Sequence, residues 1–128
     1  MRLTGLDHLV LTVTDIDRSV TFYGTVLGMQ PVTFENGRHA LRFGDQQINL
    51  HRFHEEHAPH ALTPTPGSAD LCLLVDTPIE DVVAELATHG VERMSEIVDR
   101  VGAAGGLRSV YLRDPDGNLI ELSNTIEP

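Results

Sequence analysis

The chain has 128 residues, 41% of them hydrophobic, and a formal net charge of −10 at pH 7. This length and composition predict one globular domain. The acidic balance argues against a nucleic-acid partner, and no apolar run approaches the roughly 20 residues of a membrane span. Because Cys72 is the only cysteine and the N-terminus lacks a signal-peptide pattern, we expect a cytoplasmic protein.

The first half of the chain predicts one strand, one helix and three further strands. Residues 8–13 alternate between two faces, as a half-buried strand does. In residues 15–28, Asp15 or Asp17 can cap a helix, and Gly28 suits its C-terminal end. Three short strands should follow, separated by the turns "ENG" and "GD", at 31–34, 38–43 and 46–53.

The second half repeats the same series. A strand is expected within 69–76, a helix over 77–90, and strands around 91–99, 107–113 and 118–123. The spacing supports the repeat, because the pairs 8 and 70, 15 and 77, 20 and 82, and 28 and 90 are each separated by 62 residues. In the last strand the offset becomes 72, from Asn49 to Glu121, which predicts ten extra residues in the loop around "VGAAGG".

This repeat predicts an α+β fold made of two βαβββ modules. One helix covers only one face of a four-stranded sheet, so we expect the modules to pair into an open curled sheet with the helices outside. The predicted single domain covers residues 1–128. Its parts are module 1 at about 3–53, a linker at 54–67 and module 2 at about 68–124.

Alternation places a set of polar side chains on the open face of the predicted sheets, away from the helices. The set consists of His8, Asn49, His51, Asp70 and Glu121. Glu121 stands in mid-strand between Ile120 and Leu122, where two interpretations compete: it faces solvent, or it lies in a shared cavity with His8. In a cavity, an ionised carboxylate would cost several kcal/mol unless it were paired or bound to a metal.

The stretches "LDHLVLTVTDIDRSVTFYGTVLGM" and "SVYLRDPDGNLIELSN" resemble the vicinal oxygen chelate superfamily of glyoxalases, bleomycin resistance proteins and dioxygenases. The segments "INLHRF" and "GSADLCLLVD" are similar to those of the glyoxalase domain-containing protein 5 group. The resemblance covers nearly the whole chain. It implies paired βαβββ modules around a divalent metal ion (Zn, Ni, Co, Mn or Fe), and it leaves the substrate open.

The resemblance also implies which residues bind the ion. His8 matches the first-strand metal ligand of the family, and Glu121 matches the last-strand ligand. Asp70 stands where a histidine is usual and Asn49 where a glutamate or glutamine is usual, so both remain candidates for metal or substrate binding. His51 lies on the same face as Asn49. We expect His8, His51 and Glu121 to bind the metal.

These residues predict a metal-dependent, glyoxalase-like lyase or isomerase. The ion would chelate two adjacent substrate oxygens and stabilise an enediolate, with Glu121 as the catalytic group that moves the proton. Alternatives are an extradiol-type dioxygenase, since two histidines and a glutamate match a non-haem iron site, and an antibiotic-binding resistance protein. The partners expected are a small-molecule substrate and a second copy of the chain in a homodimer. Further substrate contacts are predicted from Arg42, Tyr111 and Arg113.

Overall fold

The computed structural model describes residues 1–126 of the chain, so the last two residues of the predicted domain, Glu127 and Pro128, lie outside the described residues. The chain divides into two compact units, Met1–Gly67 and Ser68–Pro128. Within residues 1–126, no helix is both long and apolar enough to cross a membrane.

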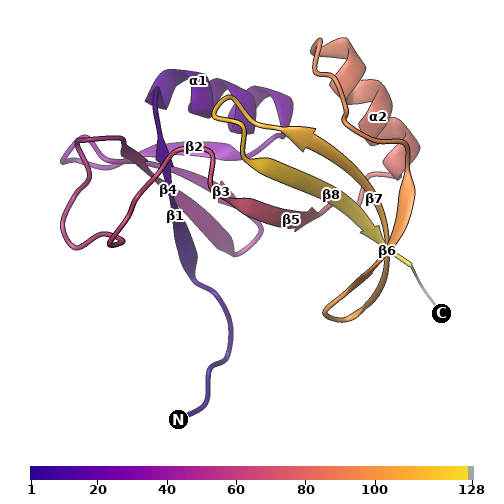
Figure 1. Ribbon diagram of the computed structural model, residues 1–128, viewed down its shortest axis with the longest axis horizontal. Helices are drawn as coiled ribbons and strands as arrows, with labels where there is room; N and C mark the ends of the chain where they lie inside the picture. Colours follow the sequence, from indigo (N-terminus) through magenta and orange to yellow (C-terminus); the bar gives the residue numbers. More distant parts are fainter. Residues whose placement is uncertain (127–128) are drawn as a thin grey trace. The chain divides into compact units, whose positions relative to one another are not determined.

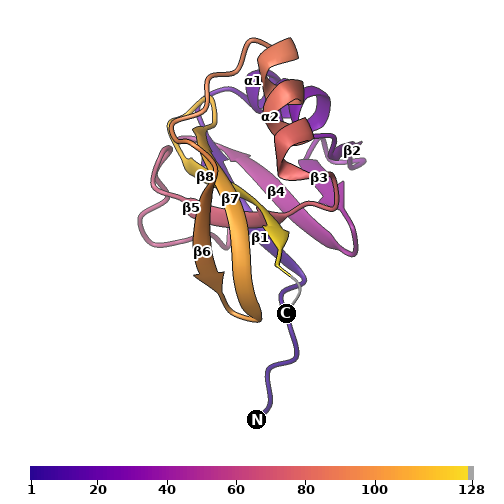
Figure 2. The same ribbon diagram turned by 90° about the vertical axis from the view of Figure 1, so that its right-hand side faces the viewer.

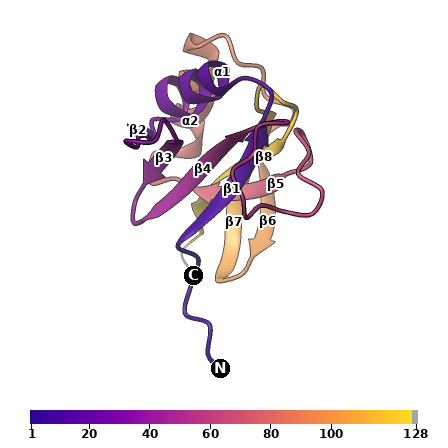
Figure 3. The ribbon, with the colours of Figure 1, turned by 90° about the vertical axis from the view of Figure 1, so that its left-hand side faces the viewer.

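Unit 1 contains one mixed sheet and one helical segment (Figures 1 and 3). Its strands lie in the order β1-β4-β3-β2, with β1 parallel to β4 and the other pairs antiparallel. The elements are β1 (His8–Val13), α1 (Ile16–Val20), η1 (Thr21–Val26), β2 (Gln30–Thr33), β3 (His39–Phe43) and β4 (Gln46–Arg52). These bounds confirm the element order predicted for the first half of the chain.

The helical segment of unit 1 begins as α1 and continues as the π-helix η1. Asp15 is the N-cap, since its side chain accepts a hydrogen bond from the backbone N–H of Arg18. Gly28 follows the C-cap with φ +78, a conformation that glycine adopts without strain. The predicted cap and end are therefore both confirmed, whereas the π-helical turn has no counterpart in the prediction.

Unit 2 repeats this arrangement with strand order β5-β8-β7-β6 (Figures 1 and 2). Its elements are β5 (Asp70–Leu74), α2 (Ile79–Thr88), β6 (Val98–Gly102), β7 (Gly105–Arg113) and β8 (Leu119–Thr125). Helix α2 packs on β7 and β8 and ends before Gly90, whose φ is +68. The α+β fold with two βαβββ modules is thus confirmed.

The strand register confirms the repeat residue by residue. Leu9 pairs with Ile48 in unit 1, and Leu71 pairs with Ile120 in unit 2, which reproduces the offsets of 62 and 72. The helix-facing side chains form each core, as the alternation predicted. The fully or nearly fully buried members include Leu11, Val13, Ile48 and Leu50 in unit 1 and Val110, Leu112, Ile120 and Leu122 in unit 2.

One prediction about the second half was wrong, and the predicted place of the extra residues is confirmed by the strand register. The strand expected at 91–99 begins only at Val98, and the preceding segment makes a single isolated bridge, between Arg93 and Leu112. The extra residues lie where they were predicted, because Pro31 pairs with Leu41 in unit 1 and the equivalent Arg93 bridges to Leu112 in unit 2. The offset is thus still 62 at Arg93 and has become 71 at Leu112, which places most of the insertion in the β6–β7 hairpin around "VGAAGG". The stretch "VGAAGG" is a tight β-hairpin in which Gly102 pairs with Gly105. It forms a hairpin because both flanking strands remain in register up to the turn.

Candidate functional site

His8 lies at the start of β1, on the open face of unit 1. Its Nδ1 donates a hydrogen bond of 2.7 Å to the Asp7 carboxylate, and its side chain is 45% exposed. In the neutral imidazole, donation from one ring nitrogen to a carboxylate leaves the lone pair on the other nitrogen. His8 Nε2 is therefore oriented and chemically suited to bind a metal ion.

Asn49 occupies the middle of β4 on the same face. Its side-chain oxygen accepts a hydrogen bond of 2.6 Å from the Gln47 amide, and Gln47 in turn accepts one of 2.9 Å from Arg42 Nε. Arg42, predicted to contact substrate, is thus engaged in orienting the Asn49 amide. Since a carbonyl oxygen has two lone pairs, Asn49 retains one for a further partner.

His51 is the most buried of the predicted site residues, with 9% of its surface exposed. No described residue hydrogen-bonds to its Nδ1, and its ring meets the His57 ring edge to face at 5.4 Å between centroids. Burial, followed by the charges of His57 and Arg38, lowers the pKa of His51 below its ordinary value. These surroundings therefore favour the neutral form of the imidazole.

The β1–β4 register separates His8 from His51. Asn49 pairs with Val10, two residues beyond His8, whereas His51 pairs with Thr12, four residues beyond it. At a rise of about 3.3 Å per residue and about 4.8 Å between strands, His8 lies about 8 Å from Asn49 and about 14 Å from His51, Cα to Cα. Side chains stand nearly perpendicular to a sheet, so the register favours Asn49 over His51 as the neighbour of His8 at one ion.

In unit 2, Glu121 lies in the centre of β8 between Cys72 on β5 and Tyr111 on β7. It is half-buried, and its Oε2 accepts a hydrogen bond of 3.3 Å from the Ser123 hydroxyl. Ser123 is fully buried and also hydrogen-bonds to Cys72 at 3.2 Å and to Ser109 at 2.7 Å. This hydrogen-bond network holds the Oε2 atom of the Glu121 carboxylate in place.

Cys72 is held as a thiol by the same surroundings. Burial raises the pKa of Cys72, and the neighbouring Glu121 charge raises it further. A protonated thiol is a poor nucleophile, so Cys72 is assigned no chemical role. Asp70, at the exposed start of β5, pairs with Leu119 and lies two residues from Cys72 on the same face.

The remaining predicted substrate residues have protein partners. Tyr111 accepts a hydrogen bond of 3.1 Å from Arg100 Nε, and the Arg100 guanidinium also lies 5.6 Å from the Tyr111 ring. Arg113 donates to the Gly117 carbonyl at 3.3 Å and so supports the turn before β8. These contacts give the three predicted substrate residues structural roles, and their contact with substrate stays a prediction.

Two residues important for the geometry were missed by the sequence analysis. Asn118 and Asp114 are almost completely buried, and the Asn118 amide donates to Asp114 Oδ2 at 2.7 Å. The Asn118 side-chain oxygen accepts from the backbone N–H of Ala69 at 2.8 Å, directly before β5. The "DPDGN" motif could have indicated this role. Its polar residues hydrogen-bond the start of β5 to the start of β8 and so set the register of Asp70 and Glu121.

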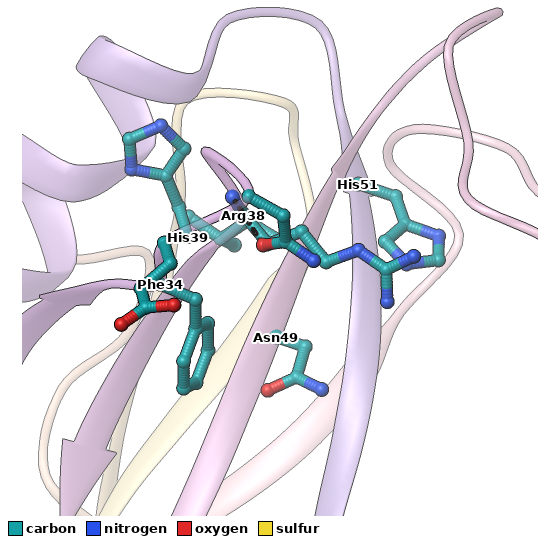
Figure 4. Close-up of a pocket in the computed structure, with 8 residues that line it drawn as sticks. Phe34, Arg38, His39, Asn49 and His51 are labelled. Carbon is teal, nitrogen blue, oxygen red and sulfur yellow. Dashed lines mark hydrogen bonds between the residues drawn. The ribbon is translucent and has the colours of Figure 1, made fainter.

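The predicted ligands divide between the two units, with His8, Asn49 and His51 in unit 1 and Asp70 and Glu121 in unit 2. Within residues 1–126, no three histidine, cysteine, aspartate or glutamate side chains are grouped closely enough to hold an ion. Unit 1 does contain a pocket of about 600 Å³, shown in Figure 4. Its lining includes Phe34, Arg38, Asn49 and His51.

Comparison with known proteins shows long, well-covered similarities. The chain is 52% identical to virulence protein STM3117 of Salmonella typhimurium over 98% of its own length and 88% of that protein. It is 48% identical to the glyoxalase domain-containing protein RDO1 of Mycosarcoma maydis, over 97% of this chain and 70% of that one. The crystal structure of the Salmonella protein matches with a TM-score of 0.96, over 98% of this chain and 100% of the other.

More distant structures share the fold. A lactoylglutathione lyase from Agrobacterium tumefaciens matches with a TM-score of 0.73 at 21% identity, covering 97% of this chain and 96% of that one. The family model described as Glyoxalase/Bleomycin resistance protein/Dioxygenase superfamily matches residues 5–122. The chain therefore belongs to the glyoxalase/bleomycin resistance protein/dioxygenase superfamily, as its motifs indicated.

Proposed function

We propose that this protein is a metal-dependent, glyoxalase-like lyase or isomerase that acts on a small substrate. The observation that carries the proposal is the matching register of the two units. His8 and Asn49 in unit 1 occupy the same positions as Asp70 and Glu121 in unit 2, on the open face of each sheet. The imidazole nitrogen and amide oxygen of the first pair and the carboxylate oxygens of the second suit one divalent ion if the units pair.

The residues present fit such an ion. His8 keeps Nε2 available because Asp7 accepts from Nδ1. The carboxylates of Asp70 and Glu121 are hard anionic donors, and Asn49 adds a neutral oxygen. We assign His51, which the sequence analysis expected as a ligand, to the pocket instead, because the register favours Asn49 beside His8.

Glu121 is the proposed catalytic residue. A divalent ion would supply positive charge beside the reacting oxygens of the substrate. Glu121 would take a proton from the adjacent carbon and return it to the neighbouring one. The hydrogen bond from Ser123 holds Oε2, so the other oxygen, Oε1, is the one proposed to move the proton.

Metal analysis tests the site. Protein purified without chelator or nickel affinity should contain about one divalent ion per functional site. We expect His8→Ala and Glu121→Ala to lose most of it, since too few donors remain to replace the hydration of the ion. The exposed His89 supplies the matched control, His89→Ala, which should keep the ion. If both site variants bind metal as tightly as the parent, the assignment is wrong.

A second comparison ranks the remaining ligands. Asp70→Ala should weaken metal binding more than His51→Ala, because the register places Asp70, and not His51, at a position equivalent to His8. The opposite order would return His51 to the ligand set.

Turnover assays separate the lyase from the two alternative functions. The protein, reconstituted with different divalent ions, is offered hemithioacetals and catechols while oxygen uptake is recorded. A lyase should convert a hemithioacetal without oxygen and show a primary isotope effect when the substrate carries deuterium next to the carbonyl. Iron-dependent oxygen consumption with a catechol would instead establish a dioxygenase, and tight binding without turnover a sequestering protein. Glu121→Gln with full lyase turnover would remove the proposed proton transfer.

A further inference from the structure

The pocket of unit 1 has properties that the proposed chemistry does not use. Its volume of about 600 Å³ lies within the usual range for a small-molecule site. All of its lining residues belong to β3, β4 and the turn before β3, so the pocket is complete within unit 1. The residues that line the pocket should therefore indicate which kind of ligand it binds.

Arg38 provides the charge of the pocket. Its backbone is fixed, since its N–H donates to the Asn36 side-chain oxygen at 3.2 Å. Among the described residues, the arginines in ion pairs with carboxylates are Arg52, Arg93 and Arg108, and Arg38 is in none of these pairs. A guanidinium lacking a protein carboxylate presents a planar fork of donors that matches a ligand carboxylate.

His51 and Asn49 add polar groups beside Arg38. Figure 4 shows the Arg38 guanidinium reaching toward the His51 ring, with the Asn49 amide on the neighbouring stretch of β4. His51 is 91% buried (9% exposed), and its Nδ1 lacks a partner among the described residues. A buried polar atom without a partner is costly, and a ligand hydrogen bond would relieve that cost.

Phe34 supplies an apolar wall of the same pocket, with 37% of its surface exposed. An aromatic face next to an arginine fork suits a ligand with a flat apolar body and one anionic end. The anion should carry a single charge, because Glu35 also lines the pocket and the chain has a net charge of −10. A phosphate dianion would require further cations to offset this repulsion.

We propose that this pocket binds a small monocarboxylate with a planar apolar body, held by Arg38 and hydrogen-bonded to His51. The further step, that this ligand is the substrate of the enzyme, rests on the proposed function. The ligand's binding does not, since every residue that lines the pocket belongs to unit 1, Glu121 is not among them, and the proposed contacts need no metal.

The test measures binding of benzoate by isothermal titration calorimetry to metal-free Glu121→Gln protein, in which lyase chemistry is absent. Benzoate should bind, and its neutral analogue benzamide should bind at least tenfold more weakly. Arg38→Gln should weaken benzoate binding at least tenfold. Arg52→Gln is the matched control: Arg52 is an exposed arginine of unit 1, alternates to the other face of β4 from His51, and should change affinity less than twofold.

Two further readouts define the site. Phe34→Ala should weaken benzoate binding while Phe34→Tyr retains it, and benzoate should shift the ring resonances of His51, assigned with His51→Asn. The proposal is overturned if benzoate does not bind at 20 mM (roughly the weak limit of a specific site), or if Arg38→Gln binds like the parent. Benzamide binding as tightly as benzoate would also overturn it, as would tighter binding of phenyl phosphate, which would exclude a monocarboxylate. Failure of the lyase assays with benzoate binding intact would contradict only the proposed function.

Discussion

Asn118→Ala is the most direct test of the hydrogen bonds that connect β5 to β8. Asn118 is 1% exposed and its amide makes two hydrogen bonds, one to the Asp114 carboxylate and one to the Ala69 backbone N–H. The bond to a charged group is worth about 1.5–3 kcal/mol and the neutral bond about 0.5–1.5 kcal/mol. Alanine removes both and leaves two groups without this partner, so we expect a loss of about 2–4 kcal/mol in the free energy of unfolding.

Urea denaturation followed by circular dichroism measures this loss. With a slope of about 2 kcal/mol per molar urea, the midpoint should fall by about 1–2 M. Asn36→Ala is the control, because the exposed Asn36 makes a side-chain hydrogen bond of 3.2 Å to a backbone N–H, and it should cost less than about 1 kcal/mol. If Asn118→Ala lowers the free energy of unfolding no more than Asn36→Ala does, the hydrogen bonds of Asn118 do not stabilise the unit and the reasoning is refuted.

Three further predictions concern packing, pH and assembly. Leu41→Ala should lower the free energy of unfolding by about 2–5 kcal/mol because Leu41 is fully buried, whereas Leu62→Ala, at a 99% exposed site, should change it by less than about 0.5 kcal/mol in the same urea assay. The hydrogen bond from Arg108 lowers the pKa of Glu80, so the stability difference between the parent and Glu80→Gln should be present above the ordinary pKa of a glutamate. It should disappear as the pH falls through the lowered value, and a pH-independent difference in denaturation midpoints would contradict this. Sedimentation should show a homodimer, since the strand order leaves β1 and β2 as the edges of one sheet and β5 and β6 as the edges of the other within the described units. A stable species near 14.1 kDa, at micromolar concentration and with metal present, would contradict this prediction.

Local patterns in the sequence were sufficient for most of the fold. Alternation and turn residues predicted the strands because a strand with one buried face repeats every two residues. The constant offset from His8 to Asp70 predicted the repeat because both modules keep the same strand, helix and helix end. The strand predicted at 91–99 begins later than expected because the residues before Val98 form no continuous strand pairing. Their single bridge, to β7, depends on a partner that is distant in the sequence.

The candidate site required more than these patterns. Alternation correctly placed His8, Asn49 and His51 on one face, but a face does not say which residues are neighbours. Neighbours across strands depend on register, and the β1–β4 pairing places Asn49 nearer to His8 than His51. Register depends on groups far apart in the chain, such as Asn118 and Ala69, whose bond fixes β8 against β5.

The sequence by itself determined the two modules, the superfamily and the polar residues of the open faces, because these follow from residue order and spacing. Only the tertiary structure decided how those residues are used. It buried His51 without a partner for Nδ1, engaged Arg42 and Arg113 in protein hydrogen bonds, and left Arg38 in a pocket outside the ion pairs of the described residues. Burial and hydrogen bonding depend on which segments meet in space, and spacing along the chain does not specify that.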